Sequence, residues 1–276
     1  LALKQQVKLR KRILALKARN IVPGLAILLI GQDAASAVYV RNKQKLCHEL
    51  GLNFYLAEFK ATAPLVKIKR EIQALNQDRK IHGIIIQLPL PGKFDPLDLI
   101  SEVDPRKDVD GLHPANIGRL SFGQEWFVPA TPRGILSLLE EYRIPVMGQH
   151  IVVVGFGYVA GMPLSLILAK AKATVTIVQD KTKDLAKLLR EADMIISAAG
   201  QPGLIKGNMI KTGATVIDVG ITKKGTNWVG DVDTATVAKK AKYLTPVPGG
   251  VGPLTVTALI SNLVAAAEYS RSRGQN

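Results

Sequence analysis

The sequence has few of the residues that form covalent or metal cross-links. Its 276 residues include one cysteine, Cys47, and four scattered histidines. A lone cysteine excludes a disulfide within the chain and fits a reducing compartment. So few histidines and cysteines also argue against a transition-metal site with protein ligands, and we expect no metal. The N-terminal stretch lacks a signal-peptide pattern, so we expect a cytoplasmic protein.

Long hydrophobic runs and acidic residues are scarce as well. No apolar run approaches the roughly 18–20 residues of a membrane span, so we expect no membrane partner. The 22 acidic residues are outnumbered by 37 basic ones, which gives a formal net charge of +15. The basic residues are spread along predicted helices without a nucleic-acid-binding motif, and aromatic residues make up 5%. We therefore expect no nucleic acid, but a solvated basic surface or one that attracts an acidic small molecule.

The clearest pattern present is a strand, glycine turn, helix and second strand between residues 150 and 180. A β-branched run leads into the turn Gly155-Phe156-Gly157-Tyr-Val-Ala, and a second such run ends near Asp180. In a dinucleotide-binding unit the glycines admit a pyrophosphate, and the acid binds both ribose hydroxyls. The alternative is a tight strand–helix turn with a solvated aspartate. The pattern favours NAD or NADP as cofactor.

The rest of the chain alternates between predicted helices and strands, which indicates an α/β fold with parallel sheets covered by helices. The predicted helices are 3–19, 34–50, 64–76, 95–101, 131–142 with Thr131 as N-cap, 183–190 capped by Thr182, and 254–270. The predicted strands are 25–30, 52–59, 83–86, 151–154, 173–178, 194–197 and 215–219, with a possible edge strand at 228–232. Residues 103–127 are less regular, and we interpret them as a crossing between two domains.

Two predicted elements carry side chains suited to chemistry. Ser36, Tyr39 and Lys43 lie on one face of the helix 34–50, where they could hold a planar ring and move a proton. Alternatively, Tyr39 packs in the core and Lys43 extends to water. Gln87 follows the strand 83–86 and can orient an amine or a carbonyl. It can equally be a polar strand end.

A third motif, Lys107-Asp-Val-Asp-Gly111, places Asp108 and Asp110 on opposite sides of an extended chain. Because of this alternation, we expect one of the two carboxylates to face a ligand. A carboxylate in that position can recognise adjacent N–H donors of a heterocycle. The alternative is a charged loop without a ligand.

Together these segments resemble the bifunctional methylenetetrahydrofolate dehydrogenase/methenyltetrahydrofolate cyclohydrolase family. The resemblance covers nearly the whole chain in order. It is carried by Ser36-x-x-Tyr39-Val-x-x-Lys43, Gln87-Leu-Pro-Leu-Pro91, Lys107-Asp-Val-Asp-Gly111, Pro129-x-Thr-Pro-x-Gly134, Ile217-Asp-Val-Gly-Ile221 and Pro246-Val-Pro-Gly-Gly-Val-Gly-Pro-Leu-Thr255.

The resemblance implies two three-layer α/β domains flanking a cleft. Residues 1–112 with 253–276 would form a folate-binding catalytic domain, and 113–252 a Rossmann-like NAD(P)-binding domain. The implied reactions are oxidation of 5,10-methylenetetrahydrofolate to 5,10-methenyltetrahydrofolate with NAD(P)+, then hydrolysis to 10-formyltetrahydrofolate. Family members are usually homodimers through the second domain, which we expect here too.

The resemblance also assigns roles to individual residues. It implies that Lys43, Gln87 and Tyr39 form the catalytic set. The implied folate-binding residues are Ser36, Tyr39, Asp110, Pro248, Gly249 and Gly250. The implied nucleotide-binding residues are Gly155, Phe156, Gly157, Asp180 and Ile221.

The sequence departs from the family pattern at two nucleotide-binding positions. An arginine and a serine usually bind the 2′-phosphate of NADP where this chain has Phe156 and Asp180. A lost cation and a gained carboxylate both disfavour that phosphate, so we predict NAD over NADP. Lys181 and Lys183 could still reach a 2′-phosphate. Two alternatives remain open: a monofunctional NAD-dependent dehydrogenase, and a non-catalytic folate- or nucleic-acid-binding protein in which Phe156 blocks the nucleotide site.

Overall fold

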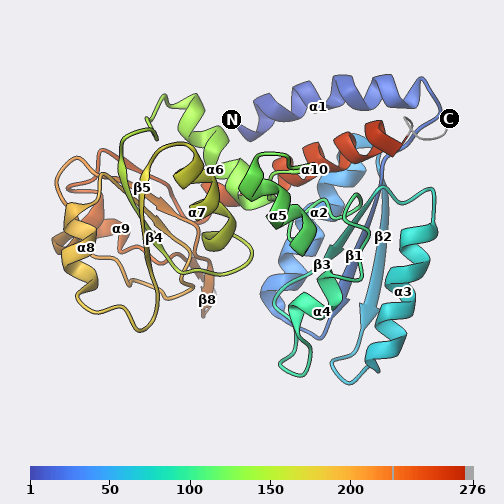
Figure 1. Ribbon diagram of the computed structural model, residues 1–276, viewed down its shortest axis with the longest axis horizontal. Coiled ribbons are helices and arrows are strands. Elements are labelled where there is room, and N and C mark those ends of the chain that lie inside the picture. The colour runs from blue at the N-terminus through green and yellow to red at the C-terminus, as the bar shows by residue number, and fades with distance from the viewer. Residues whose placement is uncertain (226, 271–276) are drawn as a thin grey trace. The chain divides into compact units, whose positions relative to one another are not determined.

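The computed structural model describes residues 1–225 and 227–270, and the chain folds into two compact α/β units (Figure 1). The first unit comprises Leu1–Ala130 and the chain from Val256 onward, and the second comprises Thr131–Thr255. The first boundary falls later than the predicted 112/113. Part of the stretch interpreted as an irregular crossing is the helix α5 (Pro114–Phe122), which belongs to the first unit.

The first unit is built on a parallel sheet with strand order β2–β1–β3. Its strands are β1 (Gly24–Ile30), β2 (Asn53–Phe59) and β3 (Gly83–Ile86). Every residue of β1 is buried, because helices cover both faces of the sheet. On one face pack α1 (Ala2–Lys17), α2 (Ala34–Leu50) and most of α10 (Val251–Ser270). On the other pack α3 (Leu65–Gln77) and α4 (Pro96–Ile100), as Figure 1 shows.

By length and composition α10 could cross a membrane, although polar residues interrupt its apolar stretch. In the structure 67% of its most apolar window is buried, and its residues from Val256 onward share one core with α1, α2 and β1. The Asn262 side chain donates to the carbonyls of Val109 and Val128, both at 2.9 Å. This helix is therefore a structural part of the first unit's core.

The second unit is built on a five-stranded parallel sheet with strand order β10–β7–β6–β4–β5. Its strands are β4 (His150–Val154), β5 (Thr174–Val178), β6 (Met194–Ser197), β7 (Thr215–Asp218) and β10 (Tyr243–Leu244). One face is covered by α6 (Ala130–Glu141) and α7 (Gly161–Lys170). The other is covered by α8 (Leu185–Glu191), the 3-10 turn η1 (Gly207–Met209) and α9 (Thr234–Val237).

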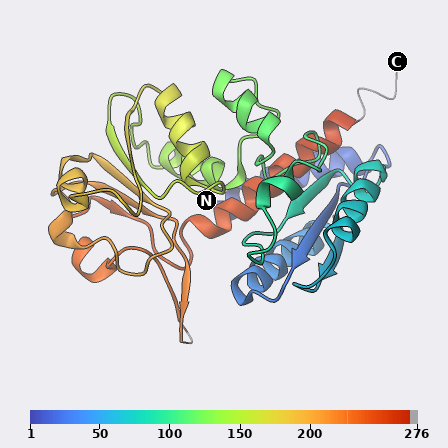
Figure 2. The same cartoon turned by 60° about the horizontal axis from the view of Figure 1, so that its bottom comes forward.

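Three local predictions in the second unit were wrong. The edge strand expected at 228–232 is instead β9 (Asn227–Val229), which pairs antiparallel with β8 (Thr222–Lys224) in a hairpin that extends from the unit in Figure 2. Thr131 lies inside α6 rather than capping it, since the helix begins one residue earlier. Thr182 does not cap α8, because its hydroxyl accepts the N–H of Gln179 at 2.8 Å.

Candidate functional site

The helix α2 brings the predicted Ser36 and Lys43 against the end of β3. The carboxylate of Asp33 accepts the N–H of Ser36 at 2.7 Å and caps the helix, which ends at Gly51 in the left-handed conformation. The buried hydroxyl of Ser36 donates to the carbonyl of Leu88 at 3.2 Å. Seven residues further along the helix, Lys43 is only 7% exposed. The alternative in which Lys43 extends to water is therefore wrong.

The amine of Lys43 and the amide of Gln87 form a buried pair. Lys43 Nζ donates to Gln87 Oε1 at 2.9 Å. The amide nitrogen of Gln87 donates to the carbonyl of Leu88 at 2.8 Å, which turns the amide oxygen toward the amine. Burial lowers the pKa of Lys43, while the nearby Asp110 and Cys47 raise it to a lesser extent. The site therefore favours a neutral amine at a lower pH than in water.

Acidic groups around Lys43 are also pushed toward their neutral forms. Burial raises the pKa of Asp110, and the charge of Lys43 opposes that rise. Burial raises the pKa of the Cys47 thiol to about 12 and also raises the pKa of Tyr39. Sequence reasoning did not place Cys47 near the amine, although a spacing of four residues on one helix contains that signal. Burial therefore shifts the pKa values of Lys43 and Asp110 toward their neutral forms, which suits this pair to proton transfer.

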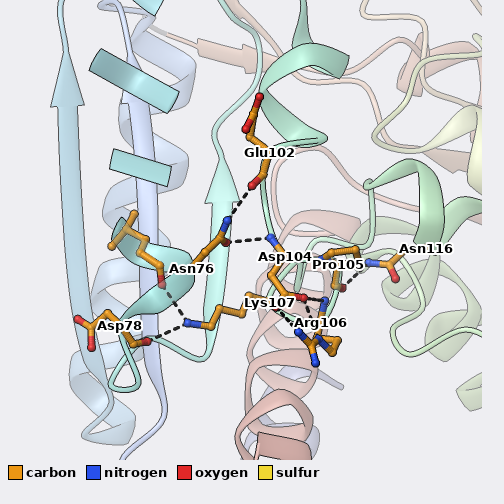
Figure 3. Close-up of polar contacts among 9 residues, drawn as sticks. Asn76, Asp78, Glu102, Asp104, Pro105, Arg106, Lys107 and Asn116 are labelled. Atoms are coloured by element: carbon orange, nitrogen blue, oxygen red, sulfur yellow. Dashed lines mark hydrogen bonds and ion pairs between the residues drawn. The ribbon is translucent and has the colours of Figure 1, made fainter. Parts of the chain in front are cut away.

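The loop that carries Asp110 is anchored to the end of α3 (Figure 3). Lys107 Nζ donates to the carbonyls of Leu75 and Asp78 at 2.9 and 2.8 Å. The side chain of Asn76 donates to the carbonyl of Glu102 at 2.7 Å and accepts the N–H of Asp104 at 2.8 Å. Asn76 was missed by sequence reasoning, because a lone asparagine in a helix gives no pattern.

The two aspartates of the Lys107–Gly111 motif have different environments. Asp108 is buried and accepts the N–H groups of Gly111 and His113 at 3.1 and 2.7 Å. It also accepts a hydrogen bond from the side-chain amide of Asn116 at 2.8 Å, so Asp108 holds the loop in its conformation. Burial raises the pKa of Asp108 despite these bonds. Asp110 is partly exposed and close enough to Lys43 to shift its pKa, so it is the better ligand-binding candidate.

In the second unit the glycine turn between β4 and α7 has the geometry of a nucleotide-binding turn. Gly155 has φ +94°, and a Cβ there would lie 2.5 Å from the carbonyl oxygen of Ala198. A Cβ on Gly157 would meet nothing within 4 Å, so the backbone is bare at that point. A Cβ on Gly161, where α7 begins, would lie 1.9 Å from Gly155 O. A bare turn next to a helix N-terminus fits a pyrophosphate.

The close helix–strand approach is thus at Gly161, one residue beyond Ala160 in the predicted turn.

The two residues predicted to select the cofactor are accessible. Phe156 is 42% exposed, and Asp180 lies in an exposed turn after β5, paired with Lys181 at 3.3 Å. The N–H of Gly155 donates to the carbonyl of Val178 at 2.9 Å, so β5 ends beside the turn.

The remaining predicted residues lie in loops at the end of β7 and before α10. Ile221 is partly exposed between β7 and β8. Pro248, Gly249 and Gly250 belong to the second unit, whereas Lys43 and Gln87 belong to the first. Thr245 anchors their loop, since its hydroxyl accepts the N–H of Asp218 at 2.8 Å. In the described part of the chain, no group of three or more metal-binding side chains comes together.

Comparisons with known proteins match the two parts of the chain to two domains of one family. Residues 1–110 match the catalytic domain of tetrahydrofolate dehydrogenase/cyclohydrolase, and residues 129–271 match its NAD(P)-binding domain. The bifunctional protein FolD of Nitrosomonas eutropha is 46% identical over 276 residues, which is 100% of this chain and 94% of the relative.

Two solved structures share the whole fold. The bifunctional FolD enzyme from Campylobacter jejuni gives a TM-score of 0.94 at 39% identity, over 98% of this chain and 96% of that one. The Trypanosoma brucei methylenetetrahydrofolate dehydrogenase-cyclohydrolase, solved with NADP and an inhibitor, gives 0.93 at 37% identity, over 98% and 95%. This chain therefore belongs to the tetrahydrofolate dehydrogenase/cyclohydrolase family.

Proposed function

We propose that this chain oxidises 5,10-methylenetetrahydrofolate with NAD(P)+ and hydrolyses the resulting 5,10-methenyltetrahydrofolate to 10-formyltetrahydrofolate. The observation that carries the proposal is the buried pair of Lys43 and Gln87 beside Asp110. A monofunctional dehydrogenase would not require such an amine, because hydride transfer needs no protein base. A non-catalytic binding protein would require a blocked nucleotide site, yet Gly157 is bare and Phe156 is partly exposed.

In the oxidation, the bound nicotinamide supplies the hydride acceptor. The protein's contribution is alignment, since the lone pair of the bridge nitrogen stabilises the cation that develops on the one-carbon unit. We assign Tyr39 to stacking against the folate ring and Asp110 to its N–H donors. Ser36 fixes the start of this surface through its bond to Leu88. Pro248, Gly249 and Gly250 would complete folate binding from their loop.

In the hydrolysis, a base must take a proton from water while the oxygen bonds to the methenyl carbon. The neutral amine of Lys43 is suited to this step, because burial lowers its pKa toward the working range. The ammonium so formed can return the proton to the ring nitrogen as the carbon–nitrogen bond breaks. Gln87 holds the amine in one position throughout, since its oxygen can accept from either protonation state.

For the nucleotide, we propose that Gly155 and Gly157 bind the pyrophosphate and that Ile221 lines the nicotinamide end. Asp180 and Phe156 would favour NAD over NADP. The edge strand β5 has a single neighbour and exposes 40% of Ile177, which supports self-association into a homodimer through the second unit. The single cysteine supports a cytoplasmic location.

One spectrophotometric experiment tests the central proposal. Methylenetetrahydrofolate is mixed with the protein and NAD+ or NADP+, and the absorbance of the methenyl product is followed together with that of the reduced nucleotide. We expect the methenyl band to rise with nucleotide reduction. It should then decay faster than the band of methenyltetrahydrofolate added to the same buffer without protein. Nucleotide reduction with no accelerated decay would identify a monofunctional dehydrogenase, and no reduction with either nucleotide would contradict the proposal.

Gln87→Glu is expected to move the pH profile of the hydrolysis to higher pH. The variant places a carboxylate where the amide oxygen lies 2.9 Å from Lys43 Nζ, and a neighbouring opposite charge raises an amine pKa by about 1–3 units. The neutral base exists only above that pKa, so kcat at neutral pH falls and recovers in alkali. The measurement is kcat for methenyl hydrolysis from pH 6 to 10, with Gln87→Met as the uncharged control. An unshifted Gln87→Glu profile would exclude Lys43 as the base.

A further inference from the structure

Two buried carboxylates lie near the carboxyl edge of the second unit's five-stranded sheet. Asp218 is the last residue of β7 and is 2% exposed, and Asp231 follows the β8–β9 hairpin and is 0% exposed. In the described part of the chain, N–H and O–H groups are their partners, and no cation forms an ion pair with either. Burying a charged group without a cation is costly in free energy, so the presence of two such carboxylates needs an explanation.

Asp231 holds the loop that follows β6. Its Oδ2 accepts the hydroxyl of Ser197 at 2.8 Å and the N–H groups of Ala199 and Gly200 at 2.8 and 3.2 Å. Its Oδ1 is buried without a hydrogen-bond partner. A Cβ on Gly220 would lie 2.1 Å from that oxygen, so the loop after β7 closes directly over it.

Asp218 holds Asp231 in turn. Its Oδ1 accepts the N–H groups of Gly220 and Asp231, both at 3.0 Å, and its Oδ2 accepts the N–H of Val232 at 2.9 Å. Burial raises the pKa of Asp218 to about 6 in spite of these three bonds. Asp218 therefore positions Asp231, and Asp231 positions the loop after β6. We refer to these two residues as the Asp218–Asp231 pair.

The loop held by Asp231 borders the predicted nucleotide site. In the sheet, Val154 pairs with Ser197 and Ser197 with Asp218, so the loops after β4, β6 and β7 emerge side by side. The carbonyl of Ala198 lies against Gly155, where a Cβ would be 2.5 Å away. Ligands of open parallel sheets bind at this carboxyl edge. The Asp218–Asp231 pair thus fixes the loop after β6, which lies beside the glycine turn, and the loop after β7, which follows the next strand of the sheet.

We propose that Asp231 is a positioning residue for the nicotinamide nucleotide, which fixes the loop 198–200 beside Gly155 and is itself oriented by Asp218. The proposal rests on the proposed dehydrogenase function. Without the carboxylate, the N–H groups of Ala199 and Gly200 lose their common acceptor and the loop is free to move into the nucleotide's path. A misplacement of this kind typically weakens a site by about 10- to 100-fold.

The test compares Asp231→Ala and Asp231→Asn with the control Asp233→Asn, two residues away, where the carboxylate caps α9 at a partly exposed position. Three quantities are measured: the dissociation constant of NAD+ or NADP+ by equilibrium titration, the nucleotide-independent hydrolysis of methenyltetrahydrofolate, and the thermal midpoint of the free protein. We expect a rise of about 10- to 100-fold in the nucleotide dissociation constant for Asp231→Ala, a smaller rise for Asp231→Asn, and no change for Asp233→Asn. Hydrolysis should stay within about twofold of wild type.

Each outcome separates the two proposals. If the wild-type chain binds neither nucleotide, the proposed dehydrogenase function fails. If it binds nucleotide and both Asp231 variants bind nucleotide as tightly as the wild type, the positioning role fails and the dehydrogenase function stands. A parallel loss of nucleotide binding and hydrolysis, with a lowered thermal midpoint, would show a purely structural role and overturn the inference. If Asp231→Ala does not fold, Asp231→Asn decides: its amide oxygen is a weaker acceptor than a carboxylate oxygen, so the nucleotide dissociation constant should still rise, and an unchanged constant would overturn the positioning role.

Discussion

Lys43→Met is expected to lower kcat for methenyl hydrolysis by about 10²- to 10⁴-fold while nucleotide-linked oxidation continues. Methionine has nearly the length of lysine and fills the buried position without a charge, so packing around it should persist. Hydrolysis loses the group that takes a proton from water. Oxidation requires only alignment of the two ligands, so its rate should fall far less than that of hydrolysis.

The measurement is the pair of rates in one preparation, with methylenetetrahydrofolate for the oxidation and methenyltetrahydrofolate for the hydrolysis. Lys45→Met is the matched control, because Lys45 lies on the same helix with its side chain 77% exposed and pairs only loosely with Glu49 at 3.9 Å. We expect the control to retain both rates. Hydrolysis retained by Lys43→Met, or both rates lost in proportion, would contradict the assignment of Lys43 as the base.

The double variant Phe156→Arg/Asp180→Ser is expected to raise the ratio of kcat/KM for NADP+ to that for NAD+ by 100-fold or more, a gain of about 2.7 kcal/mol in discrimination. The 2′-phosphate of NADP is a dianion, and both changes act on it. Removing the carboxylate of Asp180 ends a like-charge repulsion, and the guanidinium supplies a bidentate partner. The wild-type chain should prefer NAD+.

The two single variants apportion this effect, since Asp180→Ser only removes the repulsion and Phe156→Arg only adds the cation. Lys181→Met and Lys183→Met provide the opposite test, because either lysine could compensate for the missing arginine. Lys181 already pairs with Asp180, which reduces its availability to a phosphate. A wild-type preference for NADP+ of tenfold or more would refute the predicted selectivity, and its loss in a lysine variant would identify the compensating cation.

Much of the fold could be predicted because burial leaves a strong mark on the sequence. The buried strands at 83–86 and 194–197 have the predicted bounds, since a strand covered on both faces must be apolar throughout. The helix α5 was missed because glycine, proline and asparagine recur around it, although His113 caps its first turn and Gly123 ends it. The strand β8 was missed because three polar residues give no alternation.

The candidate site, like the fold, could be predicted only in part from the sequence. Spacing placed Ser36, Tyr39 and Lys43 on one face, but only the fold decides that Lys43 is buried and that Gln87 contacts it. The contacts of the Asp218–Asp231 pair could not be predicted, because the groups that donate hydrogen bonds to these carboxylates lie in separate loops of the sequence. Local patterns reveal periodicity, whereas these contacts depend on which strand ends the sheet brings together.

The division of the first unit between two ends of the chain has a consequence for biosynthesis. The second unit is one continuous segment, Thr131–Thr255, and can fold as soon as it has left the ribosome. The first unit is begun earlier, but its core includes α10 residues that are translated only after the whole second unit. The nascent chain thus finishes its halves in reverse order. Until α10 is made, the apolar residues of α1, α2 and β1 that pack against it lack that cover.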